Sequence, residues 1–299
     1  MSAAKRTSTQ YLPKGLIIHH EDKDVIVVEK PCNLLTIGTD RDKTKTVHTI
    51  LNDYVRKGDH RSRNRIYIVH RLDRETSGIL ILAKSESAKM YLQDHWQETD
   101  KYYLTVVHGT LAEKSGTISS CLTENSALTV YSTHDPTLGK LSHTEYEVLK
   151  EGKGFSVLAI RLLTGRKHQI RVHLSEKGHP VVGDRKYGKG YEVHGNLALH
   201  SQSLSFNHPV SGKRLTFETG IPDYFTRLIG NFAVEAAVGW LDPSCADACT
   251  LDTGHRQHRQ TVVWQTGRSG CKLQPQKAGA SFPLLSQLLH GQYPYGTWC

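Results

Sequence analysis

An acidic loop between two apolar runs constrains this chain more than any other feature of its sequence. Residues 67–84 are Tyr-Ile-Val-His-Arg-Leu-Asp-Arg-Glu-Thr-Ser-Gly-Ile-Leu-Ile-Leu-Ala-Lys. The runs 66–69 and 79–83 have the aliphatic, β-branched composition of strands, whereas the polar segment between them carries Asp73 and Glu75. The pattern therefore predicts a carboxylate on a loop that two strands hold in place.

The same segment has a purely structural explanation. Asp73 could cap a turn, Arg71 and Arg74 could pair with the two acids, and Gly78 could relax the backbone where the second strand begins. A short motif alone does not separate these explanations, so the rest of the chain has to decide.

The distribution of charge favours a polyanionic partner for the front of the chain. The net charge is +9 over 299 residues, and residues 1–230 hold 33 Lys and Arg against 25 Asp and Glu, while residues 231–299 hold 5 against 4. A basic surface of this kind fits nucleic acid, although excess charge can also serve solubility alone. The basic segment 57–65, which runs directly into the acidic loop, has the same two explanations.

The sequence predicts no contact with a membrane and a cytoplasmic location. It contains no run of about 18 apolar residues, and its first ten residues lack the apolar core of a signal peptide. A basic start with Ser and Thr is also compatible with transit to an organelle. In a reducing compartment the six Cys are expected to be thiols.

Periodicity and turn residues predict one domain of mixed secondary structure. We expect a flexible basic tail over 1–14, a folded domain over 15–228, which the resemblance described below implies to be catalytic, and an unassigned, poorly ordered extension over 229–299. The expected strands are 16–19, 25–29, 101–107, the hairpin 144–149 with 155–162 and the hairpin 199–206 with 214–218, with short strands between 110 and 141. The expected helices are 46–56, 85–97 and one that includes 170–177.

Several common chemistries lack their motifs. There is no phosphate-binding Gly-x-x-x-x-Gly-Lys-Ser/Thr loop, no Gly-x-Gly-x-x-Gly, no Gly-x-Ser-x-Gly and no His-Glu-x-x-His. The extension could be drawn as a zinc site, but its spacing matches no standard finger, and we expect no metal there. Its candidate ligands are Cys245, Cys249, His255, His258 and Cys271.

Cations beside aromatic residues recur on the predicted turns and strands. Such pairs suit unpaired RNA, because a cation contacts phosphate while a ring stacks on a base; each Tyr could equally be a core residue. The pairs are Arg65 with Tyr67, Lys101 with Tyr102 and Tyr103, and Arg185 and Lys186 with Tyr187.

Residues 70–78, His-Arg-Leu-Asp-Arg-Glu-Thr-Ser-Gly, resemble the signature of the RluA family of pseudouridine synthases. Segments similar to the family's other motifs occur in the family's order, and the resemblance covers about residues 15–228. These segments are 28–31, 101–103, 163–173, 178–184 and the closing hairpin at 199–200 and 206–209. The resemblance implies an α/β protein of the α+β type, the pseudouridine synthase fold, with a mixed, largely antiparallel sheet and a central catalytic cleft.

The resemblance also implies the activity. Uridine in ribosomal RNA or tRNA would be isomerised to pseudouridine by a monomeric enzyme without cofactor or metal, after the target base is flipped out of the RNA. One departure is Cys32-Asn33, where the family has a small residue and Gly; Asn tolerates a positive φ, so we expect the turn to survive. The family's frequent S4 RNA-binding domain has no counterpart here, so RNA choice is expected to rest on the catalytic domain.

Family motifs assign roles to individual residues. Asp73 matches the catalytic Asp, which could attack C1′ or act on the ribose, and could then remove the proton from C5. Arg171 matches its basic partner, with Arg166 as an alternative or a phosphate contact, and Tyr103 would stack on the base while Arg71 fills the vacated space. The expected catalytic residues are Asp73, Arg171 and Tyr103, and the expected substrate-binding residues are His70, Arg71, Leu72, Thr76, Arg166, His168, Gln169 and Lys30.

Two other functions remain open at this point. A catalytically silent RNA-binding protein on the same fold would bind without turnover, although Asp73 and Arg171 are both present. A hydrolase that uses Asp73 would release free uracil.

Overall fold

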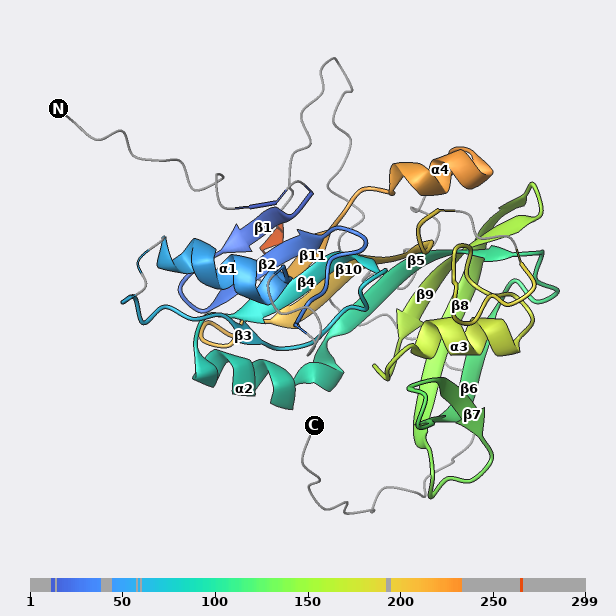
Figure 1. The fold of residues 1–299 in the computed structure, drawn as a ribbon, viewed down its shortest axis with the longest axis horizontal. Coiled ribbons are helices and arrows are strands. Elements are labelled where there is room, and N and C mark those ends of the chain that lie inside the picture. The colour runs from blue at the N-terminus through green and yellow to red at the C-terminus, as the bar shows by residue number, and fades with distance from the viewer. Residues whose placement is uncertain are drawn as a thin grey trace, which may run out of the picture. The chain divides into compact units, whose positions relative to one another are not determined.

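A single mixed sheet organises the part of the chain that the structure describes. The computed structural model describes residues 12–13, 15–38, 45–57, 59, 61–191 and 195–232, and the backbone of 264–265. Within these residues the sheet has 12 strands (Figure 1). Its main path is β1 (Ile17–Glu21), β2 (Val25–Lys30), β4 (Ser77–Ala83), β10 (Leu199–Asn207), β5 (Asp100–His108), β9 (Phe155–Leu162), β8 (Lys140–Gly152), β6 (Ser115–Glu124) and β7 (Val130–Thr133).

Pairing in this sheet is antiparallel except at its centre. There β4 runs parallel to β10, with His200 opposite Ser77 and Ser201 opposite Gly78. Three short strands lie off the main path: β3 (Tyr67–Ile68) pairs with β4, β11 (Arg214–Glu218) pairs with β10, and β12 (Trp264–Gln265) pairs with β11. The predicted mixed, largely antiparallel sheet is thus confirmed.

The first half of the sheet is buried on both faces. Alternate residues of β2 and β4 face opposite sides, which explains their continuous apolar runs. The helix α1 (Val47–Arg56) packs Val47 and Leu51 against one face, and α2 (Glu86–Asp94) packs Ala88 and Leu92 against the other. Both helices start at a residue whose hydroxyl caps them, Thr46 for α1 and Ser85 for α2.

The second half carries α3 (Gln169–Glu176) and α4 (Asp223–Ile229). In Figure 1, α3 lies in front of the strands of this half. Ile170 and Leu174 of α3, and Phe225 and Ile229 of α4, belong to one apolar cluster that also includes Leu158 of β9. The helix α3 is thereby fixed to the strands next to the sheet's centre.

The structure confirms most of the predicted elements. The helix predicted over 85–97 is too long: α2 ends at Asp94 and a 3₁₀ turn, Trp96–Glu98, follows. After His95 the backbone bonds change from the i→i−4 to the i→i−3 pattern, with Glu98 N–H on the carbonyl of His95 and Thr99 N–H on that of Trp96. The predicted positive φ at Asn33 is confirmed, with a value of 64°.

Some predictions fall outside the described residues. They concern most of the tail 1–14, part of the basic segment 57–65, and most of the extension 229–299 with its candidate zinc ligands Cys245, Cys249, His255, His258 and Cys271. Among the helices that the structure describes, none is long and apolar enough to cross a bilayer.

Candidate active site

The loop that carries Asp73 is anchored from below by a buried lysine. Lys30, at the end of β2, is 0% exposed, and its Nζ donates to the carbonyls of Pro31, Leu34 and Arg74 at 3.1, 2.8 and 3.1 Å. Burial lowers the pKa of Lys30 to about 8, against the opposing charges of Cys32, Asp73 and Glu75. Its ammonium therefore holds the loop's backbone.

A glycine allows this loop to enter the sheet. Gly78 has a φ of 110°, and a Cβ there would lie 2.2 Å from the carbonyl oxygen of Ser201 on β10. Only a residue without a side chain permits this approach. The loop before Gly78 is thus held next to β10 and β5 at the middle of the sheet.

Arg171 of α3 joins two carboxylates. Its Nη1 is 3.1 Å from Oδ2 of Asp73, while its Nε and Nη2 donate to Oδ2 and Oδ1 of Asp184 at 2.7 and 2.9 Å. Asp184 also accepts from the backbone N–H groups of Lys186 and Tyr187, at 2.9 and 3.0 Å. The guanidinium is therefore fixed on one side by a two-pronged contact and presents its remaining edge to Asp73.

Burial and pairing act against each other in this cluster. Burial alone would lower the pKa of Arg171, but the hydrogen bonds and charges of Asp184 and Asp73 outweigh it and raise that pKa. Burial would raise the pKa of Asp184, and the bonds from Arg171 outweigh that effect and lower it. Both groups are charged at neutral pH, so Asp73 has a permanent cation beside it.

His168 lies near the same Asp73 oxygen as Arg171, and Tyr187 contacts His168. His168 Nε2 is 3.7 Å from Asp73 Oδ2, and His168 Nδ1 is 2.7 Å from the hydroxyl of Tyr187. The ring of Tyr187 lies 5.2 Å from the guanidinium carbon of Arg171. One aromatic side chain therefore contacts both basic partners of Asp73.

Tyr103, on β5, is partly buried close to the carboxylate. Burial raises its pKa to about 12; a hydrogen bond with Ser201 opposes that rise, and the charge of Asp73 adds to it. Its phenol is consequently neutral at physiological pH. The structure thus brings Asp73, Arg171 and Tyr103 together, although 98 residues separate Asp73 from Arg171.

The residues predicted to bind substrate divide into two groups. Lys30, Leu72, Thr76 and Gln169 are 0, 6, 3 and 2% exposed. Direct contact between these side chains and RNA is not supported, because the protein itself surrounds them. Gln169 joins α3 to its neighbours: its amide accepts from Thr164 and donates to the carbonyl of His143.

The second group remains accessible or partly so. Arg71 is exposed, while His70, Arg166 and His168 are partly buried. His70 packs on Trp96 with ring centroids 4.4 Å apart, and burial lowers its pKa to about 3. Of the two candidate partners for Asp73, the structure selects Arg171, and Arg166 precedes the helix.

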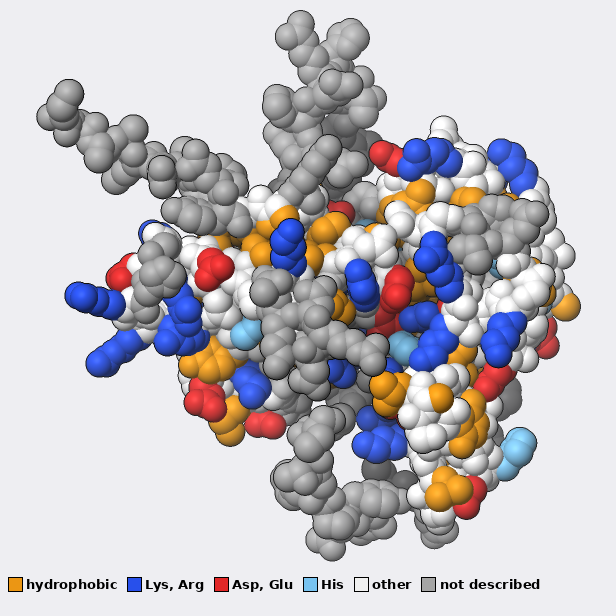
Figure 2. Space-filling model, viewed as in Figure 1, with side chains coloured by type: hydrophobic (Ala, Val, Ile, Leu, Met, Phe, Trp, Pro, Cys, Tyr) orange, Lys and Arg blue, Asp and Glu red, His pale blue; other side chains and the backbone are white. Residues whose placement is uncertain are grey.

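The surface around the site is rich in cations. Figure 2 shows acidic side chains near the middle of this face with Lys and Arg side chains on both sides of them. Phosphates of an RNA strand could contact such a rim while a base approaches the carboxylate.

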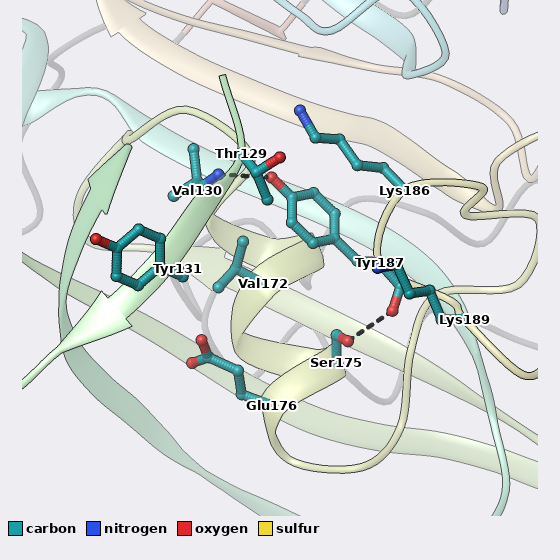
Figure 3. A pocket seen from close by; sticks show the side chains of 9 residues that line it. All are labelled: Thr129, Val130, Tyr131, Val172, Ser175, Glu176, Lys186, Tyr187 and Lys189. Carbon is teal, nitrogen blue, oxygen red and sulfur yellow. Dashed lines mark hydrogen bonds between the residues drawn. The ribbon is translucent and has the colours of Figure 1, made fainter. Parts of the chain in front are cut away.

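A shallow hollow lies next to the site, behind the loop of Tyr187. Figure 3 shows its wall, formed by β7, α3 and the segment 186–189, with the hydrogen bond from Val130 N–H to the Tyr187 hydroxyl. Asp73 does not line it. The hollow therefore lies against Tyr187 and is separate from the carboxylate of Asp73.

One cluster away from the site has ligand atoms close enough for a cation, Asp22, Asp24 and His208. His208 Nδ1 accepts from the backbone N–H groups of Val210 and Ser211, so Nε2 carries the proton and donates to Asp22 at 3.0 Å. A protonated Nε2 has no lone pair for a metal. The cluster therefore serves as a hydrogen-bonded tie between two turns.

Sequence reasoning missed Asp184 and Tyr187 as site residues. Both lay in segments that it had noted, the motif 178–184 and the basic stretch beside Tyr187. The sequence offered one signal, an acid directly after a glycine in Gly183-Asp184. In the structure Gly183 has a φ of 81° and makes a sharp turn there. Its partner could not be identified without the fold.

Comparison with known proteins gives a consistent result. The family model described as RNA pseudouridylate synthase matches residues 24–176. The uncharacterised RNA pseudouridine synthase YlyB of Bacillus subtilis is 35% identical over 227 residues, which cover 73% of each chain. The ribosomal large subunit pseudouridine synthase D of Vibrio cholerae is 32% identical over 236 residues, covering 73% of this chain and 71% of its own.

A solved structure shows the same fold. Human RNA pseudouridylate synthase domain containing 1 superposes with a TM-score of 0.61 at 26% identity, covering 76% of this chain and 94% of the human one.

Proposed function

This chain belongs to the RNA pseudouridylate synthase family and is an RNA pseudouridine synthase, and we propose that Asp73 is its catalytic carboxylate. The proposal rests on the unequal surroundings of the two carboxylate oxygens of Asp73. Arg171 and His168 both face Oδ2, whereas Oδ1 has no hydrogen bond within the described part of the chain. One oxygen is thus oriented by the protein and the other is left for the substrate.

The reaction makes two demands that a carboxylate can meet. The bond between N1 and C1′ breaks, the uracil turns, C5 bonds to C1′, and the proton on C5 leaves while N1 gains one. Asp73 could act first as a nucleophile at C1′ or on the ribose, and then as the base at C5. Atoms and electrons balance within the nucleotide, so the step is an isomerisation.

We propose that the target uridine is flipped out of the RNA before reaction. Unstacking a base costs a few kcal/mol, which contacts to the opened strand must offset. Arg71 is exposed on the same loop as Asp73 and can occupy the vacated space. Tyr103, neutral and next to Asp73, can stack on the extruded base.

The proposed substrate is a uridine in ribosomal RNA or tRNA. Relatives from Vibrio cholerae and Neisseria meningitidis are named for the large ribosomal subunit, which favours ribosomal RNA. From the sequence alone we also propose that the enzyme acts in the cytoplasm as a monomer.

The substitution Asp73→Asn tests the catalytic assignment. It keeps the shape of the side chain and removes its charge, so release of tritium from RNA labelled at uridine C5 should fall by about 1,000-fold or more. The matched control is Asp135→Asn, at an exposed position on the turn after β7, which should keep full activity.

Three outcomes distinguish the alternatives. Tritium release retained by Asp73→Asn would remove this residue from the chemistry. Binding of RNA by the unchanged enzyme without tritium release would indicate a silent RNA-binding protein. Free uracil in the product mixture would indicate a hydrolase.

A further inference from the structure

We infer that His168 is a positioning residue for Asp73 and that the hydroxyl of Tyr187 fixes the tautomer in which it acts. The inference rests on the proposed catalytic role of Asp73. It assigns the two side chains a joint task, which is to hold one carboxylate oxygen so that the other meets the substrate.

The first step is the state of the Tyr187 hydroxyl. Burial raises the pKa of Tyr187, so the phenol keeps its proton at physiological pH. The backbone N–H of Val130 donates to the phenol oxygen at 3.1 Å (Figure 3). One lone pair of the oxygen is therefore occupied, and its own proton still needs an acceptor.

His168 Nδ1 is that acceptor. It lies 2.7 Å from the phenol oxygen, and among the described residues that oxygen has hydrogen bonds only with Val130 and His168. If Nδ1 carried a proton, the phenol would have to accept twice and its own proton would have no acceptor within the described chain. The hydroxyl thus selects an imidazole whose Nδ1 is bare and whose Nε2 carries the proton.

The second step concerns the other end of the ring. Nε2 of His168 faces Oδ2 of Asp73 at 3.7 Å, so a bare Nε2 would oppose a carboxylate with its lone pair. The tautomer that Tyr187 selects is also the one that Asp73 favours. At 3.7 Å the contact is longer than a hydrogen bond, and active-site contacts of this kind shorten when substrate binds.

The surroundings keep the imidazole neutral. Burial lowers the pKa of His168, the charge of Asp73 opposes this, and the charges of Arg171, Lys186 and Lys167 add to the lowering. A neutral donor can orient Asp73 without neutralising it further, since Arg171 already supplies the positive charge.

The backbone conformation of His168 is also consistent with a specific role for its side chain. His168 has a φ of 54°, a region that non-glycine residues occupy at a cost. Glycine would adopt this conformation freely but would provide no ring. The strained conformation starts α3 and directs the imidazole between Asp73 and Tyr187.

Tyr187 is itself held firmly enough to select a tautomer. Its backbone N–H donates to Asp184 at 3.0 Å, its carbonyl accepts from Ser175 at 2.8 Å, and its ring rests against the guanidinium of Arg171. The phenol oxygen consequently has little freedom to turn away from His168.

Nitrogen-15 NMR of the full chain with labelled histidine tests the tautomer without any reference to activity. The signals of His168 are identified as those absent from His168→Gln. At pH 8 we expect a proton on Nε2 and none on Nδ1. In Tyr187→Phe only Asp73 still favours this tautomer, across a contact longer than a hydrogen bond, so we expect the form with the proton on Nδ1 to become detectable beside it. A proton on Nδ1 in the unchanged enzyme, or an unaltered Nε2 tautomer in Tyr187→Phe, would overturn the inference.

Kinetics test the consequence for Asp73. Loss of one orienting hydrogen bond in Tyr187→Phe should lower kcat about tenfold with KM within about twofold. Tyr131→Phe, a half-exposed Tyr on β7, is the matched control and should be unaffected. His168→Gln, which retains a donor and an acceptor, should keep more activity than His168→Leu, and equal losses in the two variants would contradict the positioning role.

The two proposals fail in different ways. If the unchanged enzyme releases no tritium from labelled RNA, the proposed function fails while the tautomer measurement still stands. If activity is present but the predicted tautomer is not, only the positioning role is lost.

Discussion

At the scale of single residues, burial separates those that hold the site from those that can meet RNA. Lys30 would be taken for a phosphate contact from its charge alone, yet its ammonium is enclosed and bonded to three carbonyls. Arg71 is exposed two residues before Asp73. The two cations therefore have different surroundings: Lys30 shapes the loop, and Arg71 is exposed, as its proposed contact with the substrate requires.

Paired substitutions separate these tasks. Lys30→Met leaves three buried carbonyls without a donor, so the single-turnover rate should fall about tenfold or more while the Kd for RNA changes less than about twofold. Arg71→Ala removes an exposed cation and should raise the Kd by about fivefold to tenfold. Anisotropy of labelled RNA gives both Kd values. Weakening of RNA binding by Lys30→Met to the same degree as by Arg71→Ala would restore direct contact for Lys30.

At the scale of elements, the parallel contact between β4 and β10 decides where the loop sits. The backbones of β4 and β10 come close together at Gly78, where no side chain separates them. The hairpin predictions made from local alternation carry no information on this contact, since residues 78 and 201 are far apart in sequence. The strand order at the centre of the sheet is therefore set by packing.

A pair of glycine substitutions measures what this contact contributes. Gly78→Ala combines a strained φ with a backbone clash and should lower the free energy of unfolding by about 2–4 kcal/mol. Gly154→Ala also has a positive φ, 77°, but no atom within 4 Å of the new Cβ, so it should cost about 1 kcal/mol. Urea denaturation gives both values. Equal losses would show that strain in φ, and not the approach to β10, explains the glycine.

At the scale of the whole molecule, buried neutral histidines join elements that are distant in sequence. His200 of β10 lies between the hydroxyls of Ser77 and Thr219, and His173 of α3 lies between those of Thr144 and Ser120. Burial lowers the pKa of His173 and of His200 to about 4. Each stays uncharged where an unfolded chain would take up a proton.

These two histidines, together with His70, whose pKa burial lowers to about 3, predict sensitivity to mild acid. An unfolded histidine titrates near pH 6.5, so between about pH 6.5 and 4 the unfolded chain binds protons that the folded chain does not, and stability falls as the pH falls. The free energy of unfolding should be roughly 2–4 kcal/mol lower at pH 5 than at pH 7. Urea denaturation at both values checks it.

Two variants control this measurement. His173→Gln should reduce the dependence on pH, because it removes one of the histidines whose pKa burial lowers. His134→Gln, at an exposed position, should leave the dependence unchanged. An unchanged dependence in His173→Gln would attribute the acid effect to other groups.

The local elements, and the loop that carries the proposed catalytic Asp73, could be predicted from the sequence alone. Alternation predicted the hairpins of β8 with β9 and β10 with β11, apolar residues at helical spacing predicted α1 over 46–56, and Asn33 predicted the turn after β2. These features depend on neighbours a few residues apart, and the side-chain patterns record such contacts directly.

Which residues surround Asp73 becomes clear only in the folded chain. Both Arg166 and Arg171 lie within a few residues of the predicted helix start, and the beginning of α3 at Gln169 places Arg171 against Asp73 and Asp184. The sequence also did not indicate that Lys30 is buried or that Tyr187 contacts His168. Each of these contacts joins segments that the sheet brings together, and a local pattern contains no information on which distant segment will supply the partner.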